Sequence, residues 1–179
     1  MYKILISGYY GFNNIGDESI LRTLIDNLRE KLPGVDITVL SQDPAQTSAK
    51  FAVKSARRMS LRDIFRCVRR CDLLLSGGGS LLQDATSGRS ILYYLFILRL
   101  AQLLGKQTFI YSQGIGPISS PRNRRFAAAV LRRADGIVVR DSRSRDLLRE
   151  IGVPVERVCV TADPVIRVKK ADPALLAIS

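Results

Sequence analysis

A glycine-rich stretch near the start of the chain, GYYGFNNIGDES (Gly8–Ser19), has the composition of a ligand-binding loop. It leads from a short apolar run into a predicted helix, and exposed N–H groups at a helix start favour an anion. Its glycine spacing matches neither the Walker A loop nor the dinucleotide fingerprint. Asp17 and Glu18 would repel a phosphate there, so a neutral polyol such as a sugar fits better. A carboxylate can hold two hydroxyls or act as a base on one of them, although this acidic pair equally suits the helix dipole.

Four further loops rich in glycine or polar residues each follow a predicted apolar strand. Ligands of open parallel sheets bind beyond the carboxyl ends of the strands, so we expect all these loops to form one site. The candidate binding residues in them are Gly77, Gly78, Gly79, Asp84, Gln113, Arg140 and Asp163, with Asn14 and Gly16 from the first loop.

The polar candidates in these loops leave alternatives open. Arg140 ends an apolar strand, where a charge needs a partner, and we expect an anionic ligand. Asp84 is either a polar ligand contact or a loop cap. Gln113 is either aimed at a ligand by the rigid QGIGP loop or part of a plain turn. Asp163, before a proline, either caps a turn or touches ligand.

The loops are separated by apolar strands that alternate with amphipathic helices. Strands are predicted at 3–7, 36–40, 72–76, 107–112 and 136–140, with a weaker third strand before Ser60 and a last one at VCV. Helices are predicted at about 17–32, after Ser60, at 90–104, at 121–133 and from Asp141 to Gly152. The strands are apolar throughout rather than alternating, so both sheet faces must be covered. This predicts a doubly wound, Rossmann-like parallel α/β sheet.

The composition limits the chemistry and the partners. The chain has 179 residues, a net charge of +12 and no histidine, so acid–base work falls to Asp, Glu, Lys or Tyr. Three cysteines (Cys67, Cys71 and Cys159) lack a disulfide or zinc spacing and suggest a reducing compartment, and we expect no metal site. The apolar run Ile91–Leu98 is too short to span a bilayer, which favours a buried helix over a helix on a membrane surface.

Arginines supply most of the positive charge and form two groups. One recurs at helical spacing, opposite an apolar face: Arg58, Arg62, Arg66 and Arg69. The other is Arg122, Arg124, Arg125, Arg132 and Arg133. A solvated face explains both, and attraction to anionic lipid is the functional alternative. Nucleic acid is not expected, because aromatic residues do not interleave with the basic ones.

Five motifs together resemble a known family. They are GYYGFNNIGDESIL, LLLSGGGSLLQD, YSQGIGP, VVRDSRS and TADPV. In this order and at this spacing they resemble the polysaccharide pyruvyl transferases, above all bacterial enzymes that modify the secondary cell-wall polysaccharide anchoring surface-layer proteins. The resemblance extends from Tyr2 to about Val168.

The resemblance implies a two-domain fold like that of GT-B glycosyltransferases, with the active site between the domains. It implies phosphoenolpyruvate as co-substrate, no further cofactor, and a lipid-linked or polymeric sugar acceptor, typically N-acetylmannosamine. We expect a cytoplasmic protein, with peripheral contact at the inner face of the cell membrane as the alternative. Asn14, Asp17 and Glu18 would then hold the acceptor or act as base. Arg140 would meet phosphoenolpyruvate from the first-domain side, and Gly77–Gly79 would shape the cleft.

The family's second domain, which carries basic and histidine residues for phosphoenolpyruvate, has no counterpart in this sequence. We interpret residues 1–168 as the first domain and residues 169–179 as the start of an interdomain linker, and expect this part to be inactive by itself. Two other interpretations stay open: a glycosyltransferase-like domain that uses a nucleotide-sugar, and a non-catalytic domain that binds anionic polymer or membrane.

Overall fold

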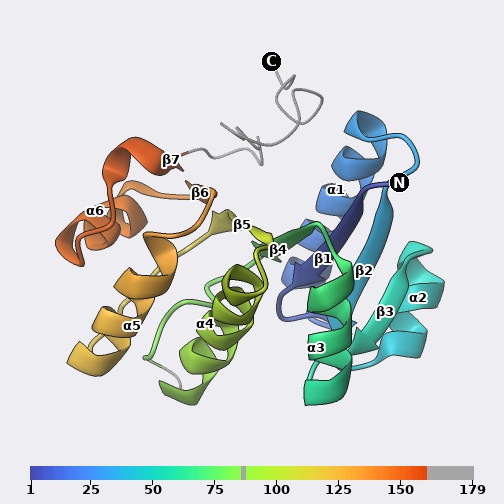
Figure 1. The fold of residues 1–179 in the computed structure, drawn as a ribbon, viewed down its shortest axis with the longest axis horizontal. Coiled ribbons are helices and arrows are strands. Elements are labelled where there is room, and N and C mark those ends of the chain that lie inside the picture. Colours follow the sequence, from blue (N-terminus) through green and yellow to red (C-terminus); the bar gives the residue numbers. More distant parts are fainter. Residues whose placement is uncertain (86–87, 161–179) are drawn as a thin grey trace.

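A single parallel sheet of seven strands forms the centre of the protein, in the order β3-β2-β1-β4-β5-β6-β7 (Figure 1). The computed structural model describes residues 1–85 and 88–160. The strands are β1 (Lys3–Ser7), β2 (Asp36–Ser41), β3 (Lys54–Arg57), β4 (Leu73–Gly77), β5 (Gln107–Gln113), β6 (Gly136–Val139) and β7 (Val158–Val160). The helices are α1 (Ile15–Lys31), α2 (Pro44–Phe51), α3 (Leu61–Arg70), α4 (Gly88–Leu103), α5 (Pro121–Leu131), α6 (Ser142–Glu150) and the 3-10 turn η1 (Val155–Arg157).

Helices cover both faces of the sheet, which explains why its strands are apolar throughout. In β1, Ile4 and Ile6 face a cluster built with α1 and α2, to which Leu24 and Phe51 belong. Leu5 faces the opposite cluster, which is built with α3, α4, α5 and α6. Figure 1 shows α3, α4 and α5 side by side over one face. The doubly wound parallel fold predicted from the sequence is therefore confirmed.

Local signals in the sequence position most helix starts correctly. The side chains of Ser60, Ser120 and Asp141 each accept a hydrogen bond from a backbone N–H in the first turn of the helix that follows. The weak third strand is confirmed as β3. Helix α1 starts at Ile15, two residues before the predicted position, because Asn14 rather than a later residue caps it.

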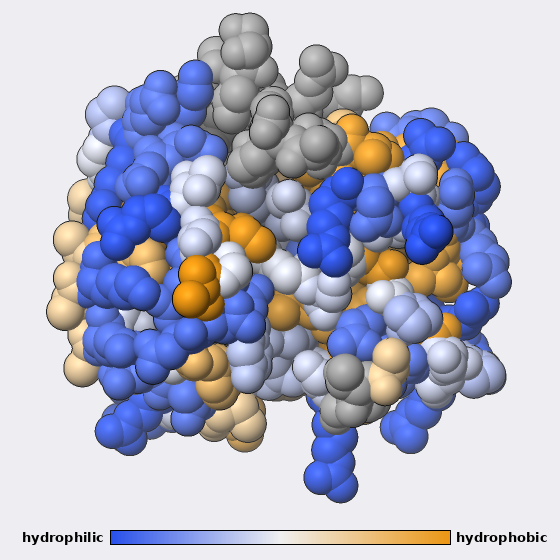
Figure 2. All heavy atoms as spheres, turned by 180° about the vertical axis from the view of Figure 1, so that it is seen from behind, coloured by the Kyte–Doolittle hydropathy of each residue, from blue (hydrophilic) through white to orange (hydrophobic). Residues whose placement is uncertain are grey.

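On the face seen from behind, hydrophilic side chains predominate, and apolar areas lie between them (Figure 2). One face of the apolar helix α4 is buried, with Tyr94, Leu95 and Leu98 at most 2% exposed, whereas Leu92, Phe96 and Leu103 on the same helix are exposed. The three cysteines are unpaired thiols. In the described part of the chain, no helix combines the length and the apolar character needed to cross a membrane.

The structure corrects one member of the predicted arginine stripe. Arg62, Arg66 and Arg69 are exposed on α3, as expected of a solvated face. Arg58 precedes that helix and is only 8% exposed. Helical spacing placed it on the solvated face, but the turn between β3 and α3 directs it inward.

Candidate functional site

Two loops run side by side at the carboxyl edge of the sheet and form the floor of the candidate site. The loop after β4 and the loop after β5 continue the parallel pairing of their strands, with a bridge between Leu82 and Ile115. The Gly114 N–H donates to the Gly79 carbonyl (3.1 Å) and the Gly116 N–H to the Leu82 carbonyl (2.8 Å). The loops expected to meet at this edge are thus joined by backbone hydrogen bonds.

The loop after β6 joins them from the other side. The Arg140 N–H donates to the Gln113 carbonyl (3.2 Å), and the Ile115 N–H donates to Ser144 Oγ (2.8 Å). Ser144 is held by Asp141 Oδ1, which accepts from both its N–H and its hydroxyl. Burial raises the pKa of Asp141, but these hydrogen bonds, together with the charge and hydrogen bonding of Arg140, hold the pKa below its usual value.

The first loop is attached to this floor by a buried tyrosine. Tyr10 is fully buried, and its hydroxyl donates to the Gly77 carbonyl at 2.7 Å. Burial raises the pKa of Tyr10, so the phenol stays protonated and keeps its role as donor. This contact brings the start of α1 next to the glycines that follow β4.

Asp17 lies over those glycines. A Cβ atom added at Gly79 would come within 2.6 Å of Asp17 Oδ1, and Gly79 has a positive φ of 60°. Any side chain at position 79 would therefore displace the carboxylate. Burial raises the pKa of Asp17, and the positive charge of Arg140 opposes that shift.

Arg140 lies across the same floor. Its Nη2 donates to Ser80 Oγ (2.7 Å), its Nε lies 3.6 Å from Asp141 Oδ2, and a Cβ at Gly114 would come within 2.7 Å of the guanidinium. The side chain is 49% exposed. β6 ends at Val139, so Arg140 lies just beyond the apolar strand, and Ser80 and Asp141 are partners of the kind that a charge at this strand end was expected to need. Its exposure leaves it open to a ligand from solvent.

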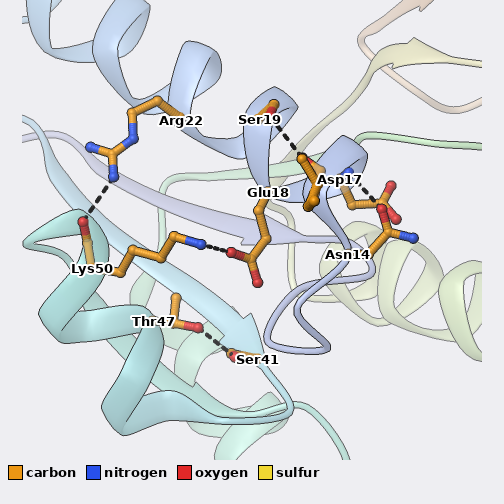
Figure 3. Close-up of polar contacts among 9 residues, drawn as sticks. Asn14, Asp17, Glu18, Ser19, Arg22, Ser41, Thr47 and Lys50 are labelled. Atoms are coloured by element: carbon orange, nitrogen blue, oxygen red, sulfur yellow. Dashed lines mark hydrogen bonds and ion pairs between the residues drawn. The ribbon is translucent and has the colours of Figure 1, made fainter.

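The two neighbouring carboxylates of the first loop point to different places. Glu18 is 6% exposed and forms an ion pair with Lys50 on α2. Figure 3 shows Glu18 directed towards Lys50, whereas Asp17 lies on the other side of the first turn of α1. Asp17 is thus the carboxylate at the junction with Gly79, and Glu18 connects two helices.

Asn14 and Gly16 serve the helix start. Asn14 Oδ1 accepts from the Asp17 N–H (3.2 Å), as Figure 3 shows, and a Cβ at Gly16 would lie 3.3 Å from that oxygen. The small residue at position 16 therefore leaves room for the cap that positions Asp17.

Asp84 connects the loop after β4 to helix α5. Its carboxylate accepts from the Ser119 N–H (2.7 Å), the Ser120 N–H (3.0 Å) and Asn123 Nδ2 (3.0 Å). The hydrogen bond from Ser119, with those from Ser120 and Asn123, lowers the pKa of Asp84. Of the two alternatives for Asp84, this geometry matches the loop cap.

The remaining candidates of these loops have structural positions: Gln113 lies beneath the floor, and Gly77 and Gly78 shape it. Gln113 is fully buried and donates to Ser76 Oγ at 2.9 Å. A Cβ atom added at Gly77 would lie 3.4 Å from Leu24 Cδ2 and 3.6 Å from Tyr10 Oη, and Gly78 has a φ of 88°, a conformation that favours glycine. The predicted residue Asp163 lies outside the described residues, as do the predicted domain end and linker.

The sequence interpretation missed a group of residues beside Asp17. The guanidinium of Arg58 lies within 6 Å of the centroids of four aromatic rings, those of Tyr9, Phe12, Tyr93 and Tyr94. These rings come from the first loop and from α4, so no local pattern could connect them to Arg58. The one available signal was the pair of aromatic residues within a glycine-rich loop. In residues 1–85 and 88–160, no three Cys, Asp or Glu side chains gather closely enough to hold a metal ion.

Comparison with known proteins places the chain in a family. The family model described as "Polysaccharide pyruvyl transferase" matches residues 14–176. The amylovoran biosynthesis protein AmsJ from Erwinia amylovora is 22% identical over 208 residues, which cover 93% of this chain and 49% of AmsJ. The chain therefore spans about half the length of this curated relative.

Solved structures share the fold at low sequence identity. HepE from Anabaena, in complex with UDP and glucose, superposes with a TM-score of 0.57 at 15% identity, over 89% of this chain and 44% of HepE. A UDP-N-acetylglucosamine 2-epimerase from Listeria monocytogenes, itself named only provisionally, superposes with a TM-score of 0.54 at 13% identity, over 87% of this chain and 44% of the epimerase. An α-glucosyltransferase in complex with UDP superposes with a TM-score of 0.52 at 17% identity, over 84% of this chain and 39% of the transferase. The sheet thus has the architecture of one half of GT-B-like glycosyltransferases and epimerases.

Proposed function

This chain belongs to the polysaccharide pyruvyl transferase family. We therefore propose that it forms the first half of an active-site cleft in which pyruvate is transferred from phosphoenolpyruvate to a sugar. The product is a cyclic ketal that bridges two hydroxyls of one sugar. The observation that carries the proposal is the placement of Asp17 and Arg140 on one glycine floor at the carboxyl edge of the sheet.

The reaction needs three kinds of group. The methylene carbon of phosphoenolpyruvate takes a proton while one sugar hydroxyl attacks the neighbouring carbon. A second hydroxyl then displaces phosphate from the same carbon and closes the ring. A base must receive the hydroxyl protons, an acid must supply the methylene proton, and positive charge must face the phosphate and carboxylate.

Asp17 suits the role of base and Arg140 that of anion contact. A carboxylate with a raised pKa is a stronger base once it has ionised, and Asp17 is partly buried beside the glycine floor. The guanidinium of Arg140 can bind a carboxylate or phosphate through two N–H groups. Glu18 is the weaker candidate for base because Lys50 already neutralises it.

The complete reaction requires more than this part of the cleft. Since the chain spans about half of AmsJ, we propose that a second domain closes over the floor and supplies further contacts to phosphoenolpyruvate. The 179-residue chain would then bind substrate without turning it over. We also propose a lipid-linked acceptor at the cytoplasmic face of the membrane, where the exposed arginines of α3 suit anionic lipid.

A domain exchange tests the roles of the two carboxylates. Residues 1–160 would replace the first half of an active family member, and phosphate release from phosphoenolpyruvate would be measured with and without acceptor. We expect release only with acceptor, a loss of about 100-fold or more in Asp17→Asn, and a much smaller loss in the matched variant Glu18→Gln. Normal turnover in Asp17→Asn would refute its role. Transfer from a UDP-sugar would instead favour a glycosyltransferase.

A further inference from the structure

An exposed pair of stacked aromatic rings lies in the first loop, at the sheet edge that carries Asp17. The rings of Tyr9 and Phe12 are parallel within 4°, with centroids 4.0 Å apart. Each residue is 38% exposed, although aromatic side chains of this size are usually buried where the fold allows it. Tyr10, between them, is by contrast fully buried.

Arg58 holds this pair in place from inside the protein. Its guanidinium carbon lies 5.6 Å from the ring centroid of Tyr9 and 5.0 Å from that of Phe12. On its other side it lies 4.9 Å from the Tyr93 ring and 5.7 Å from the Tyr94 ring, and it donates to Tyr94 Oη at 3.2 Å. Tyr93 Oη in turn donates to the Arg58 carbonyl at 2.6 Å. A cation between two rings of a loop and two rings of a helix fixes the loop without burying it.

The pair is electrostatically connected to Asp17. Burial raises the pKa of Tyr94, the charge of Arg58 opposes that shift, and the charges of Asp17 and Tyr9 add to it. The geometry of the loop gives the same arrangement: Tyr10, between Tyr9 and Phe12 in the sequence, donates to the Gly77 carbonyl, and Asp17 lies over Gly79. The stacked pair and the carboxylate are therefore both attached to the short glycine segment that follows β4.

We propose that Tyr9 and Phe12 form a platform on which a pyranose ring of the sugar acceptor stacks, with Arg58 as the residue that positions it. The inference rests on the proposed function and adds the acceptor-binding residues to it. The apolar C–H face of a pyranose packs on an aromatic ring, while its hydroxyls remain free for polar partners. Asp17 is the carboxylate within this neighbourhood, and Asn13 and Asn14 supply polar groups in the same loop.

The pair has two properties that a platform needs. A rigid aromatic surface loses little conformational entropy when a ligand binds, and the Arg58 contacts supply that rigidity. Its partial exposure keeps ring surface available to a ligand. If the two rings served only to pack the protein, full burial would stabilise the fold more than a position in which each residue is 38% exposed.

Fluorescence of the 179-residue chain tests the platform directly, because the natural sequence has no tryptophan. Phe12→Trp places a reporter in the pair, and Phe65→Trp places the matched control on α3, where Phe65 is 48% exposed. The probes are the methyl glycosides of N-acetylmannosamine, mannose and galactose. We expect at least one probe to shift the emission of Trp at position 12 in a saturable way and to leave that at position 65 unchanged.

Variants then separate stacking from loop position. Tyr9→Ala and Phe12→Ala should each weaken binding of that glycoside, measured by NMR titration, by about tenfold, the effect of losing one aromatic contact. Arg58→Met should weaken it less. Protein-detected NMR spectra of this variant should show that the Tyr9 ring resonances broaden as the pair loosens. Arg62→Met, on the exposed face of α3, is the control for Arg58.

Several results would overturn the platform. Unchanged binding in both alanine variants would do so, as would the absence of saturable binding of all three glycosides to the folded wild-type chain. Binding that perturbs the surface between α1 and α2 instead of the first loop would place the sugar elsewhere. None of these results bears on phosphoenolpyruvate, whose binding and turnover test the proposed function separately.

Discussion

Two guanidinium groups lie at the same edge of the sheet. One, Arg58, lies in a cage of four aromatic rings, those of Tyr9, Phe12, Tyr93 and Tyr94. The other, Arg140, lies where the loops after β4, β5 and β6 meet. Arg58 is 8% exposed, and its Nε and Nη1 are buried without a hydrogen-bond partner among the described residues. The Arg140 side chain is 49% exposed, hydrogen-bonded to Ser80 and close to Asp141. Burial thus assigns Arg58 to holding structure, because its unpartnered N–H groups lie inside the protein, whereas the half-exposed Arg140 presents its guanidinium to an anion from solvent.

The difference teaches that the position of an arginine in the sequence predicts its environment poorly. The end of an apolar strand suggested that the charge at position 140 needs a partner or an anionic ligand, and helical spacing suggested a solvated charge at position 58. Both environments depend on where a turn directs the side chain. The chemistry available to each arginine follows from that direction.

The largest expected effect is on stability at the cage. Arg58→Ala removes a side chain packed on four rings, and we expect the free energy of unfolding to fall by about 2–3 kcal/mol. Arg140→Ala removes an exposed side chain and should cost less than about 1 kcal/mol. Urea unfolding of both variants measures the difference, with the exposed Arg62→Ala as the control. Equal losses in the two variants would contradict the comparison.

A smaller effect is expected on the ionisation of Asp17. Because the charge of Arg140 opposes the burial shift, Arg140→Gln should raise the pKa of Asp17 further, and Arg58→Met should leave it nearly unchanged. NMR titration of the Asp17 carboxyl carbon measures both. A shift in Arg58→Met as large as that in Arg140→Gln would show that the cage also controls the carboxylate.

The same shift predicts how stability depends on pH. The pKa of Asp17 is higher in the folded state than in the unfolded state, so the unfolded state ionises first as pH rises. Asp17 therefore favours folding most below its unfolded pKa, and this contribution is lost as pH rises through the folded pKa. Relative to Asp17→Asn, the wild-type chain should lose stability across that interval, as measured by unfolding at several pH values.

The strands, the helix starts and the sheet topology were predicted well, because the sequence signals for these features are local. Apolar strands such as DLLLS, and caps such as Ser60 and Asp141, depend on neighbours in the chain. The edge at which the loops meet then followed from parallel strand topology.

The side-chain contacts at that edge could not be predicted in the same way. Asp17 and Glu18 are adjacent in sequence, yet one lies over Gly79 and the other pairs with Lys50. Which carboxylate turns to which partner depends on how α1 packs on the sheet and on α2. Arg58 reaches rings from two distant segments, and no spacing rule encodes such a contact.

Binding of phosphoenolpyruvate to the 179-residue chain tests the central claim most directly. Amide NMR titrations with phosphoenolpyruvate and, separately, with UDP would be carried out on the wild-type chain and on Arg140→Gln. We expect phosphoenolpyruvate to perturb the amides of Ser80, Gly114 and Arg140, and the perturbation to disappear in Arg140→Gln. Unchanged amides, equal perturbation in the variant, or binding of UDP in place of phosphoenolpyruvate would contradict it.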